Sequence, residues 1–457
     1  MDRREWDWQK TEQPEAAEAL TSQVQRTQRA LRDQQLRTVL NEFDGQLMKL
    51  DAGKRRIKYA KMMQSPFTFF RGSAYLFYSD AAREWMPYHT KAERPTWIQG
   101  DLHFENFGAF RNEGGQLVYD VNDFDEGYLG SYLYDVLRMS VSVSLVCRMK
   151  GFEEGQRLAL GEAYLRAYYD QIRRFAKGKD DPASYNMDEE RASGPIRRLL
   201  KKLKKRESNH YLEKVTAHMR GTRRFEASED IVPASAEERE AILAVWPSYA
   251  EGLAEQLRER VGVKDIAVKH GSGTASIGLD RYYILAEGGS GEQEPADIVL
   301  EMKEVRVPVP AYFLPRNERF WAAFGHQGKR VIATQRAMHH EADPYLGYLT
   351  LDGREYYIRE RSPYKKRLKL DAISDAAEMT AVLEGMGRLT AKMHARADAD
   401  VEQGVLAYHS EAEILAAMGD DEEAFCAFVA GWANGYAEQV EQDYELFQSW
   451  AKRRRKG

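Results

Sequence analysis

The feature that most restricts the fold of this chain is a strand-rich stretch enclosed by two helical regions. Residues 265–305 alternate apolar and polar side chains around a glycine-rich turn, a pattern typical of antiparallel strands. Further on, Asp352–Gly353 stand between two alternating segments and predict a two-residue hairpin turn. Apolar residues recur at helical spacing before this stretch, in residues 132–176, and after it, in residues 376–397. The sequence therefore predicts an α+β fold in which the strands form one compact part.

The length of the chain indicates two structural parts rather than one. With 457 residues, the chain exceeds the size at which a single hydrophobic core stops growing. We divide it into an N-terminal helical segment, a helical part, a strand-rich part and C-terminal helices that complete the helical part. The corresponding residues are 1–60, 61–257, 258–362 and 363–457.

The charges and cysteines of the chain argue against several partners. Its 67 basic and 72 acidic residues give a formal net charge of −5, so no overall attraction to nucleic acid is expected. No apolar run has the length of a membrane span, and the first residues lack the apolar core of a signal peptide. Cys147 and Cys426 lie far apart within apolar helical patterns, which argues against a disulfide and favours the cytoplasm. The sequence does not reveal the oligomeric state.

A cluster of polar residues lies within an apolar frame in the segment WIQGDLHFENFGAF. Such a cluster is costly to bury unless it is satisfied or useful. An aspartate that orients an acceptor hydroxyl, with an asparagine and a second aspartate that hold Mg²⁺, is the layout of a phosphoryl-transfer site. The candidate catalytic residues are Asp101, His103 and Asn106. The candidate Mg²⁺ ligands are Asn106, Asp123 at the end of a predicted strand, and Asp125, and Glu126 could add to this set. The alternative is a pair of Asx turns that cap a hairpin.

A glycine-rich segment and a lysine on a following strand suggest a site for nucleotide phosphates. In GSGTASIG, backbone N–H groups can approach phosphates closely at the positions Gly271, Gly273, Ser276 and Gly278. Lys303 in the strand DIVLEMKEV can reach the α- and β-phosphates of ATP. Each signal is weak alone, because a glycine-rich hairpin or a solvated lysine is the commoner explanation. Their order along the chain, followed by a helix and a hairpin, favours the nucleotide site.

Lys303 needs a carboxylate partner if it is to be held in such a site. We expect that partner on the predicted helix 328–341, where Gln335 lies in the middle and Glu341 at the end. The sequence does not show which of the two residues is the partner.

Three residues outside the main motifs are further candidates. Arg71 is the single charge in an aromatic run, which favours a buried ion pair or a phosphate contact. Lys365 is a second candidate for cofactor binding. Asp135 is expected to anchor a helix beneath the site rather than touch substrate.

These motifs resemble those of the protein-kinase-like superfamily, above all its aminoglycoside phosphotransferase and choline kinase branch. QGDLHFEN and NDFD are similar to the motifs H-G-D-x-x-x-x-N and I-D-[FW] of that branch, with Gln99 at the position of its histidine. The chain more closely resembles the uncharacterised bacterial family Domain of Unknown Function 2252, through SPFTFFRG, GDLHFENFG, NDFDE and AKMHAR. This resemblance extends from about Lys58 to Tyr444, and the family has no established substrate.

The resemblance implies a two-lobed kinase-like fold that binds ATP and Mg²⁺ in its cleft, with Glu360–Pro363 as the hinge beside the cofactor. The order of the motifs is unusual, because the catalytic segment precedes the glycine-rich segment. A circular permutation explains this order, since it keeps the packing and moves only the chain ends. We then expect a β-rich nucleotide lobe and a larger helical lobe built from both ends of the chain.

The leading hypothesis is an ATP- and Mg²⁺-dependent phosphotransferase whose hydroxyl acceptor, a small molecule, the sequence does not identify. Three alternatives remain open. A non-catalytic nucleotide-binding protein is favoured by Gln99 and the altered glycine segment. A metal-dependent hydrolase would use Asp101, His103, Asp123 and Asp125 without nucleotide. Transfer of AMP from the same cleft is the third.

Overall fold

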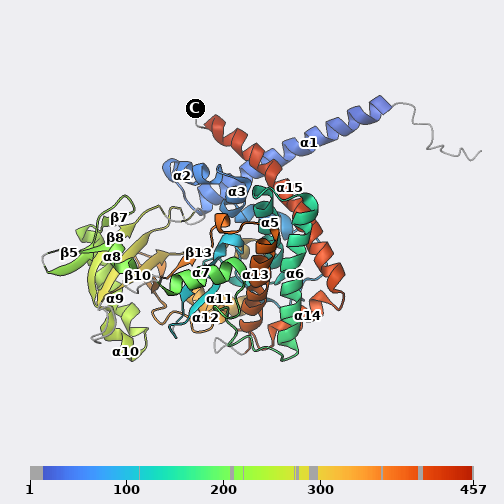
Figure 1. Cartoon of the computed structure of the whole chain (residues 1–457). Coiled ribbons are helices and arrows are strands. Elements are labelled where there is room, and N and C mark those ends of the chain that lie inside the picture. Colours follow the sequence, from blue (N-terminus) through green and yellow to red (C-terminus); the bar gives the residue numbers. More distant parts are fainter. Residues whose placement is uncertain are drawn as a thin grey trace, which may run out of the picture.

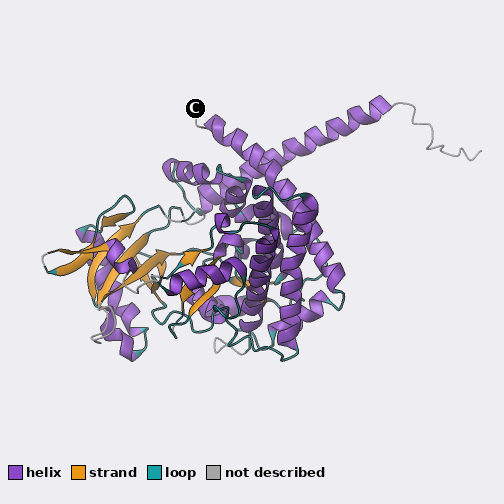
Figure 2. Ribbon diagram, viewed as in Figure 1, coloured by secondary structure: helices purple, strands orange, loops and turns teal. Residues whose placement is uncertain are grey.

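The protein has a mixed α+β structure with several antiparallel sheets, as its sequence predicted. The computed structural model describes residues 14–112, 114–205, 210–219, 221–271, 273, 277–287, 297–361, 364–399 and 405–454. The largest sheet lies on one side of the molecule and the long helices lie on the other (Figure 1, Figure 2).

The largest sheet has six strands in the order β11-β12-β10-β9-β8-β7, and every neighbouring pair is antiparallel. The strands are Ile231–Pro233 (β7), Val263–Lys269 (β8), Arg281–Glu287 (β9), Asp297–Glu304 (β10), Gly347–Leu351 (β11) and Arg354–Glu360 (β12). Helix α9 (Ala236–Glu251) supplies Trp246 to a hydrophobic core that also contains Ile284 and Leu300. Successive strand residues point to opposite faces, so Glu301 and Lys303 lie on the face away from this core.

The hairpin and the helix predicted within this region are both present. The hairpin β11–β12 turns at Asp352 and Gly353, whose φ angles of 50° and 71° are left-handed, as a type I′ turn requires. The predicted helix 328–341 is α12 (Gln327–Met338), and it ends earlier than expected because His339 is extended.

Helices from both ends of the chain share one hydrophobic core. This core includes Leu36 near the N-terminus and Ala451 near the C-terminus. Its main helices are α3 (Pro66–Gly72), α4 (Ala74–Ala81), α5 (Leu133–Met149), α6 (Glu154–Ala176), α13 (Ala376–Arg396) and α15 (Glu422–Arg454). Helices α6 and α13 approach closely at Gly387, where a Cβ atom would lie 2.4 Å from the carbonyl oxygen of Tyr164.

Short strands and helices connect these two regions. One small sheet joins β13 (Lys366–Arg367), β2 (Phe107–Arg111) and β3 (Leu117–Val121), and another pairs β1 (Thr96–Ile98) with β4 (Tyr128–Gly130). The remaining α-helices and strands are α1 (Pro14–Asn41), α2 (Ala52–Met62), α7 (Gly194–Lys204), α8 (His210–Val215), β5 (Thr216–Met219), β6 (Thr222–Phe225), α10 (Glu255–Arg258), α11 (Glu318–Ala323) and α14 (Ser410–Met418). A π-helix, Glu42–Leu47, separates α1 from α2. Parts of α1 and α15 project from the helical region (Figure 1).

The cysteines and the helices of the structure bear on two of the expectations from the sequence. Cys147 and Cys426 are both buried and free. Within the described residues, no helix combines the length and the apolar character that crossing a membrane requires.

Candidate active site

The segment that carries Asp101 is held from below by a buried aspartate on α5. The carboxylate of Asp135 accepts hydrogen bonds from the backbone N–H groups of Gln99 (2.5 Å) and Gly100 (2.9 Å). Its Oδ2 also lies 3.2 Å from Nε2 of His394 on α13. Asp135 and His394 are fully buried, so these bonds join the segment around Asp101 to a helix near the C-terminus. Asp135 was expected to anchor a helix beneath the site, and in the structure it anchors this segment.

Gln99 ties the same segment to the second aspartate motif. Its side-chain amide donates to the carbonyl oxygen of Asp123 at 2.6 Å, and its side-chain oxygen accepts from the backbone N–H of Asp101 at 2.9 Å. Between them, Gly100 has a φ of 86°, and a Cβ atom there would lie 2.1 Å from the carbonyl oxygen of Glu126. Only glycine fits this position, because both the backbone angle and the close approach exclude a side chain.

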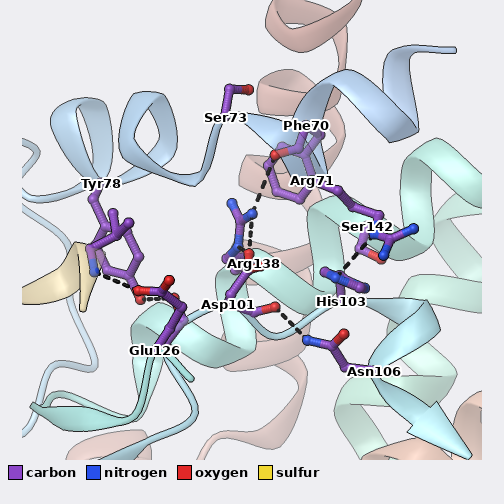
Figure 3. Close-up of polar contacts among 12 residues, drawn as sticks. Phe70, Arg71, Ser73, Tyr78, Asp101, His103, Asn106, Glu126, Arg138 and Ser142 are labelled. Carbon is purple, nitrogen blue, oxygen red and sulfur yellow. Dashed lines mark hydrogen bonds and ion pairs between the residues drawn. The ribbon is translucent and has the colours of Figure 1, made fainter. Parts of the chain in front are cut away.

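Asp101 is held in a charged and largely buried environment. Nε of Arg138 donates to Oδ1 of Asp101 at 2.7 Å, and Arg138 is itself fully buried (Figure 3). The side-chain amide of Asn106 donates to the carbonyl oxygen of Asp101 at 2.8 Å (Figure 3). Burial raises the pKa of Asp101 to about 6, although Arg138 opposes the rise. A carboxyl with this pKa is mostly ionised at neutral pH and can still accept a proton.

The lysine of the sheet meets the second aspartate motif directly. Nζ of Lys303 contacts Oδ2 of Asp125, although the two residues lie 178 positions apart in the chain. Burial disfavours the ionised form of Asp125, but Lys303, together with Arg359 and Arg281, outweighs this effect and lowers its pKa. Oδ1 of Asp123 and Oδ1 of Asp125 are buried, and neither has a hydrogen-bond partner among the described residues. Two unsatisfied carboxylate oxygens beside an asparagine suit a hard cation such as Mg²⁺.

These groups line one cleft that encloses about 1050 Å³ of space, part of which opens to solvent. The sequence-predicted residues in its wall are Arg71, Asp101, His103, Asn106, Asp123, Asp125, Gly273 and Lys303. The rest of the wall includes apolar side chains, among them Phe43 and Leu47 of the π-helix, Val309 and Tyr312, and further polar ones such as Glu126 and Arg306. The cleft therefore combines charged and polar groups with an apolar surface.

The glycine-rich segment reaches this cleft through Gly273. Gly271, Gly273 and Gly278 have φ angles of 78°, 72° and 90°, which favour glycine. Nζ of Lys61 on α2 donates to the carbonyl oxygens of Gly271 (3.2 Å) and Gly273 (2.7 Å). Ser276 lies outside the described residues. A helix from the N-terminal segment thus holds the glycine-rich segment from outside.

His103 and Arg71 form a pair at the wall of the cleft. Nε of Arg71 donates to Nε2 of His103 at 3.1 Å, and Nη1 of Arg71 also contacts Glu105. Burial, reinforced by Arg71, holds the pKa of His103 well below its usual value. The imidazole is therefore neutral and positions the guanidinium.

The predicted partner of Lys303 was placed on the wrong element. Helix α12 contains no aspartate or glutamate, and the carboxylate that contacts Lys303 is Asp125. Glu341 lies beyond the end of α12 and accepts a hydrogen bond from the side chain of Asn112 at 2.8 Å. Gln335 is buried on α12, and its Oε1 has no partner among the described residues. The spacing of apolar residues located the helix but not the side chains that face Lys303.

The contribution of α12 to the site is a buried arginine instead. Arg330 donates to the carbonyl oxygens of Gly127 (2.9 Å), Asp125 (2.7 Å) and Arg306 (3.0 Å). It therefore fixes the backbone that carries Asp125 against the strand that carries Lys303.

Glu360 and Lys365 do not line this cleft. Both line a second pocket, on the other side of Phe124, which also includes Gln335 and Arg359. Nζ of Lys365 lies 3.5 Å from the carbonyl oxygen of Asn122, at the border between the two pockets.

Sequence reasoning missed two contributors to the site. Arg138 is a charge in the middle of the apolar pattern of α5, and this signal was available. Glu126, a further candidate Mg²⁺ ligand from the sequence, lines the cleft, and burial raises its pKa to about 7. Phe43 comes from a segment whose helical pattern indicated packing but gave no sign of a pocket.

A separate group of potential metal ligands lies between α13 and α14. Within the described ranges, Asp398, His409 and Glu411 are the one set of three histidine, cysteine or acidic residues whose ligand atoms lie within 4.8 Å of one another. It contains none of the predicted Mg²⁺ ligands. Asp398 accepts from the backbone N–H of Ser410 at 2.8 Å, which caps the start of α14.

Comparison with known proteins identifies the family. The chain belongs to Domain of Unknown Function 2252, described as an uncharacterized protein conserved in bacteria, which matches residues 51–450. The closer of the two sequence resemblances is thereby confirmed. No match was found among curated proteins or among solved structures.

Proposed function

We propose that this chain is an ATP- and Mg²⁺-dependent phosphotransferase that acts on a hydroxyl group of a small molecule. The observation that carries the proposal is the contact between Lys303 and Asp125 in the cleft that Asp101 lines. Motifs far apart in the sequence thus meet in one place, with a proton acceptor, oxygen ligands for a metal ion and a phosphate-binding cation together.

Within this proposal, we interpret the architecture as a circularly permuted kinase-like fold. The sheet with α12 would be the nucleotide lobe, and the helices from both chain ends would be the larger lobe. The bond between His394 and Asp135 supports this interpretation, because it places α13 beneath the catalytic segment. The permutation predicts that neighbourhood, since AKMHAR resembles the helix that precedes the catalytic segment in the phosphotransferases.

Each residue has a defined task in the proposed reaction. The hydroxyl oxygen of the acceptor attacks the γ-phosphorus of ATP, the bond to the β-phosphate oxygen breaks, and ADP leaves. Asp101 accepts the proton of the hydroxyl. When ATP binds, Lys303 leaves Asp125 and contacts the phosphates instead. Asn106, Asp123 and Asp125 would hold Mg²⁺, which supplies charge neutralisation of the phosphates.

The proposal is tested by replacing one metal-ligand candidate. Asp123→Ala should abolish ATP consumption, because the substitution removes both the unsatisfied Oδ1 and the negative charge of a carboxylate that would hold Mg²⁺. Asp170→Ala, which removes an exposed aspartate of α6 paired with Arg173, is the matched control and should keep the wild-type rate. ATP consumption by Asp123→Ala at the wild-type rate would refute the assignment.

Two measurements separate the proposal from its alternatives. Thermal stabilisation by ATP with Mg²⁺, without turnover in any acceptor screen, would favour a non-catalytic nucleotide-binding protein. Metal-dependent hydrolysis without nucleotide would favour the hydrolase, and pyrophosphate among the products would favour AMP transfer. ADP and a phosphorylated acceptor are the products that we expect.

A further inference from the structure

The second pocket has the composition of a site for a flat heterocycle. It encloses about 540 Å³, including the part open to solvent, a size in the range of small-molecule sites. Phe110, Phe124 and His339 line it, with ring centroids of His339 at 5.1 Å from Phe110 and 4.8 Å from Phe124. Aromatic walls of this kind stack on planar ring systems.

Two amide side chains in the pocket lack partners. Nδ2 of Asn122 and Oε1 of Gln335 are buried, and neither has a hydrogen-bond partner among the described residues. Each residue is only 7% exposed. A buried polar atom without a partner costs free energy, and a ligand that pairs with it recovers that cost. One donor and one acceptor beside aromatic rings match the edge of a nucleobase, which offers both kinds of group.

The pocket adjoins the candidate active site through the segment 122–125. Asn122 and Phe124 line the second pocket, whereas Asp123 and Asp125 line the cleft. At the border, Arg359 and Lys365 approach the carbonyl oxygen of Asn122 at 3.4 and 3.5 Å.

Lys365 at this border has no carboxylate in direct contact. In the part of the chain that the structure describes, it forms no ion pair, and the carboxylates of Glu301 and Asp123 attract its charge from farther away, while burial and Arg359 lower its pKa. An anionic group that passes between the two pockets, such as a phosphate, would favour the protonated lysine.

The place expected for the base, beneath the sheet beside the hinge, carries buried ion pairs instead. Glu301 lies on the same face of the sheet as Lys303, toward the hinge, and it is fully buried. Arg281 bonds one of its carboxylate oxygens at 3.1 Å, and Arg359 bonds the other at 2.9 Å. A base stacked there would face charged groups that already satisfy each other, so this surface offers it little.

We propose that the pocket between α12 and the β2–β3 hairpin binds the base of the nucleotide, while Lys365 faces the phosphate nearest the base. Asn122 and Gln335 read the edge of the base, and the packed rings of Phe110, Phe124 and His339 form one aromatic wall against its face. The phosphates then continue past Asn122 to Lys303 in the cleft. The inference rests on the proposed function, because it assigns the base of the same ATP molecule to a pocket distinct from the cleft.

The test compares ligands with and without a base on one variant. Gln335→Leu removes the acceptor with little change in side-chain size. Calorimetric titration of the full chain with Mg²⁺ should show a loss of about tenfold in ATP affinity, the effect of about one buried hydrogen bond. Affinity for inorganic tripolyphosphate should stay unchanged, because this ligand has no base. Gln116→Leu, at an exposed glutamine of the same hairpin outside the pocket, is the control for the substitution itself.

A second readout shows that the variant is folded. Leucine replaces a buried oxygen that lacks a partner, so the melting temperature of ligand-free Gln335→Leu should equal or exceed that of the wild type. Equal ATP affinity in wild type and Gln335→Leu would overturn the base assignment and leave the proposed function intact. No ATP binding by the wild type would overturn the proposed function, and the base assignment with it.

Discussion

Replacing Asp135 by alanine tests how the segment that carries Asp101 is held. The carboxylate accepts the backbone N–H groups of Gln99 and Gly100 and contacts His394, all in a fully buried environment. Each buried donor left without an acceptor costs about 1–3 kcal/mol, so Asp135→Ala should lower the free energy of unfolding by about 3–5 kcal/mol. Folded proteins are stable by only about 5–15 kcal/mol, so this loss is a large fraction of the total.

Equilibrium unfolding in urea, followed by tryptophan fluorescence, measures this loss. We expect the midpoint to fall by about 1 M or more for Asp135→Ala. Asp135→Asn keeps one acceptor oxygen and should fall between alanine and wild type. The exposed Asp170→Ala should leave the midpoint unchanged. A shift for Asp135→Ala no larger than that of Asp170→Ala would refute the view that Asp135 anchors the segment.

Two further predictions concern charge and packing. Arg138→Met removes the cation that opposes the raised pKa of Asp101, so that pKa should rise from about 6 by about 1–3 units. Because the proposed reaction needs the ionised form of Asp101, the acid limb of the pH–rate profile should move to higher pH by the same amount, and an unmoved limb would contradict the proposed role of Asp101 as proton acceptor. Gly387→Ala should destabilise the protein by about 1–3 kcal/mol, because its Cβ atom would lie 2.4 Å from the carbonyl oxygen of Tyr164. The melting temperatures of Gly387→Ala and of a control, Gly431→Ala on α15, measure this loss. No atom lies within 4 Å of the Cβ added at Gly431, so the control should be as stable as the wild type or more stable. Equal losses at both sites would contradict the close packing of α6 and α13.

Elements with strong local patterns could be predicted from the sequence. The hairpin at Asp352–Gly353 follows from residues that tolerate left-handed backbone angles, and α13 follows from apolar residues at helical spacing. Both signals act within a few residues, so the chain reveals them without its tertiary structure. Asp135 was expected to anchor a helix beneath the site, but that it accepts the backbone N–H groups of Gln99 and Gly100 could be seen only in the structure.

Contacts between distant segments were predicted less well. Lys303 and Asp125 were each singled out, but the expected partner of Lys303 was sought on α12. The error has a physical cause, since the path of the chain between the sheet and the NDFD motif decides which carboxylate faces the lysine. Arg138 was passed over for a similar reason: its charge within the apolar pattern of α5 was visible, but its partner Asp101 lies 37 residues away in the sequence.

The sequence by itself determined the α+β class and the family, because each depends on local pattern or on motifs. The tertiary structure alone decided that Asp101, Asp123 and Lys303 line one cleft, and that a second pocket lies on the other side of Phe124. Such arrangements depend on how the whole core packs, which balances burial over many residues against the loss of chain entropy. No single segment of the sequence reveals that balance, because residues from the whole chain contribute to it.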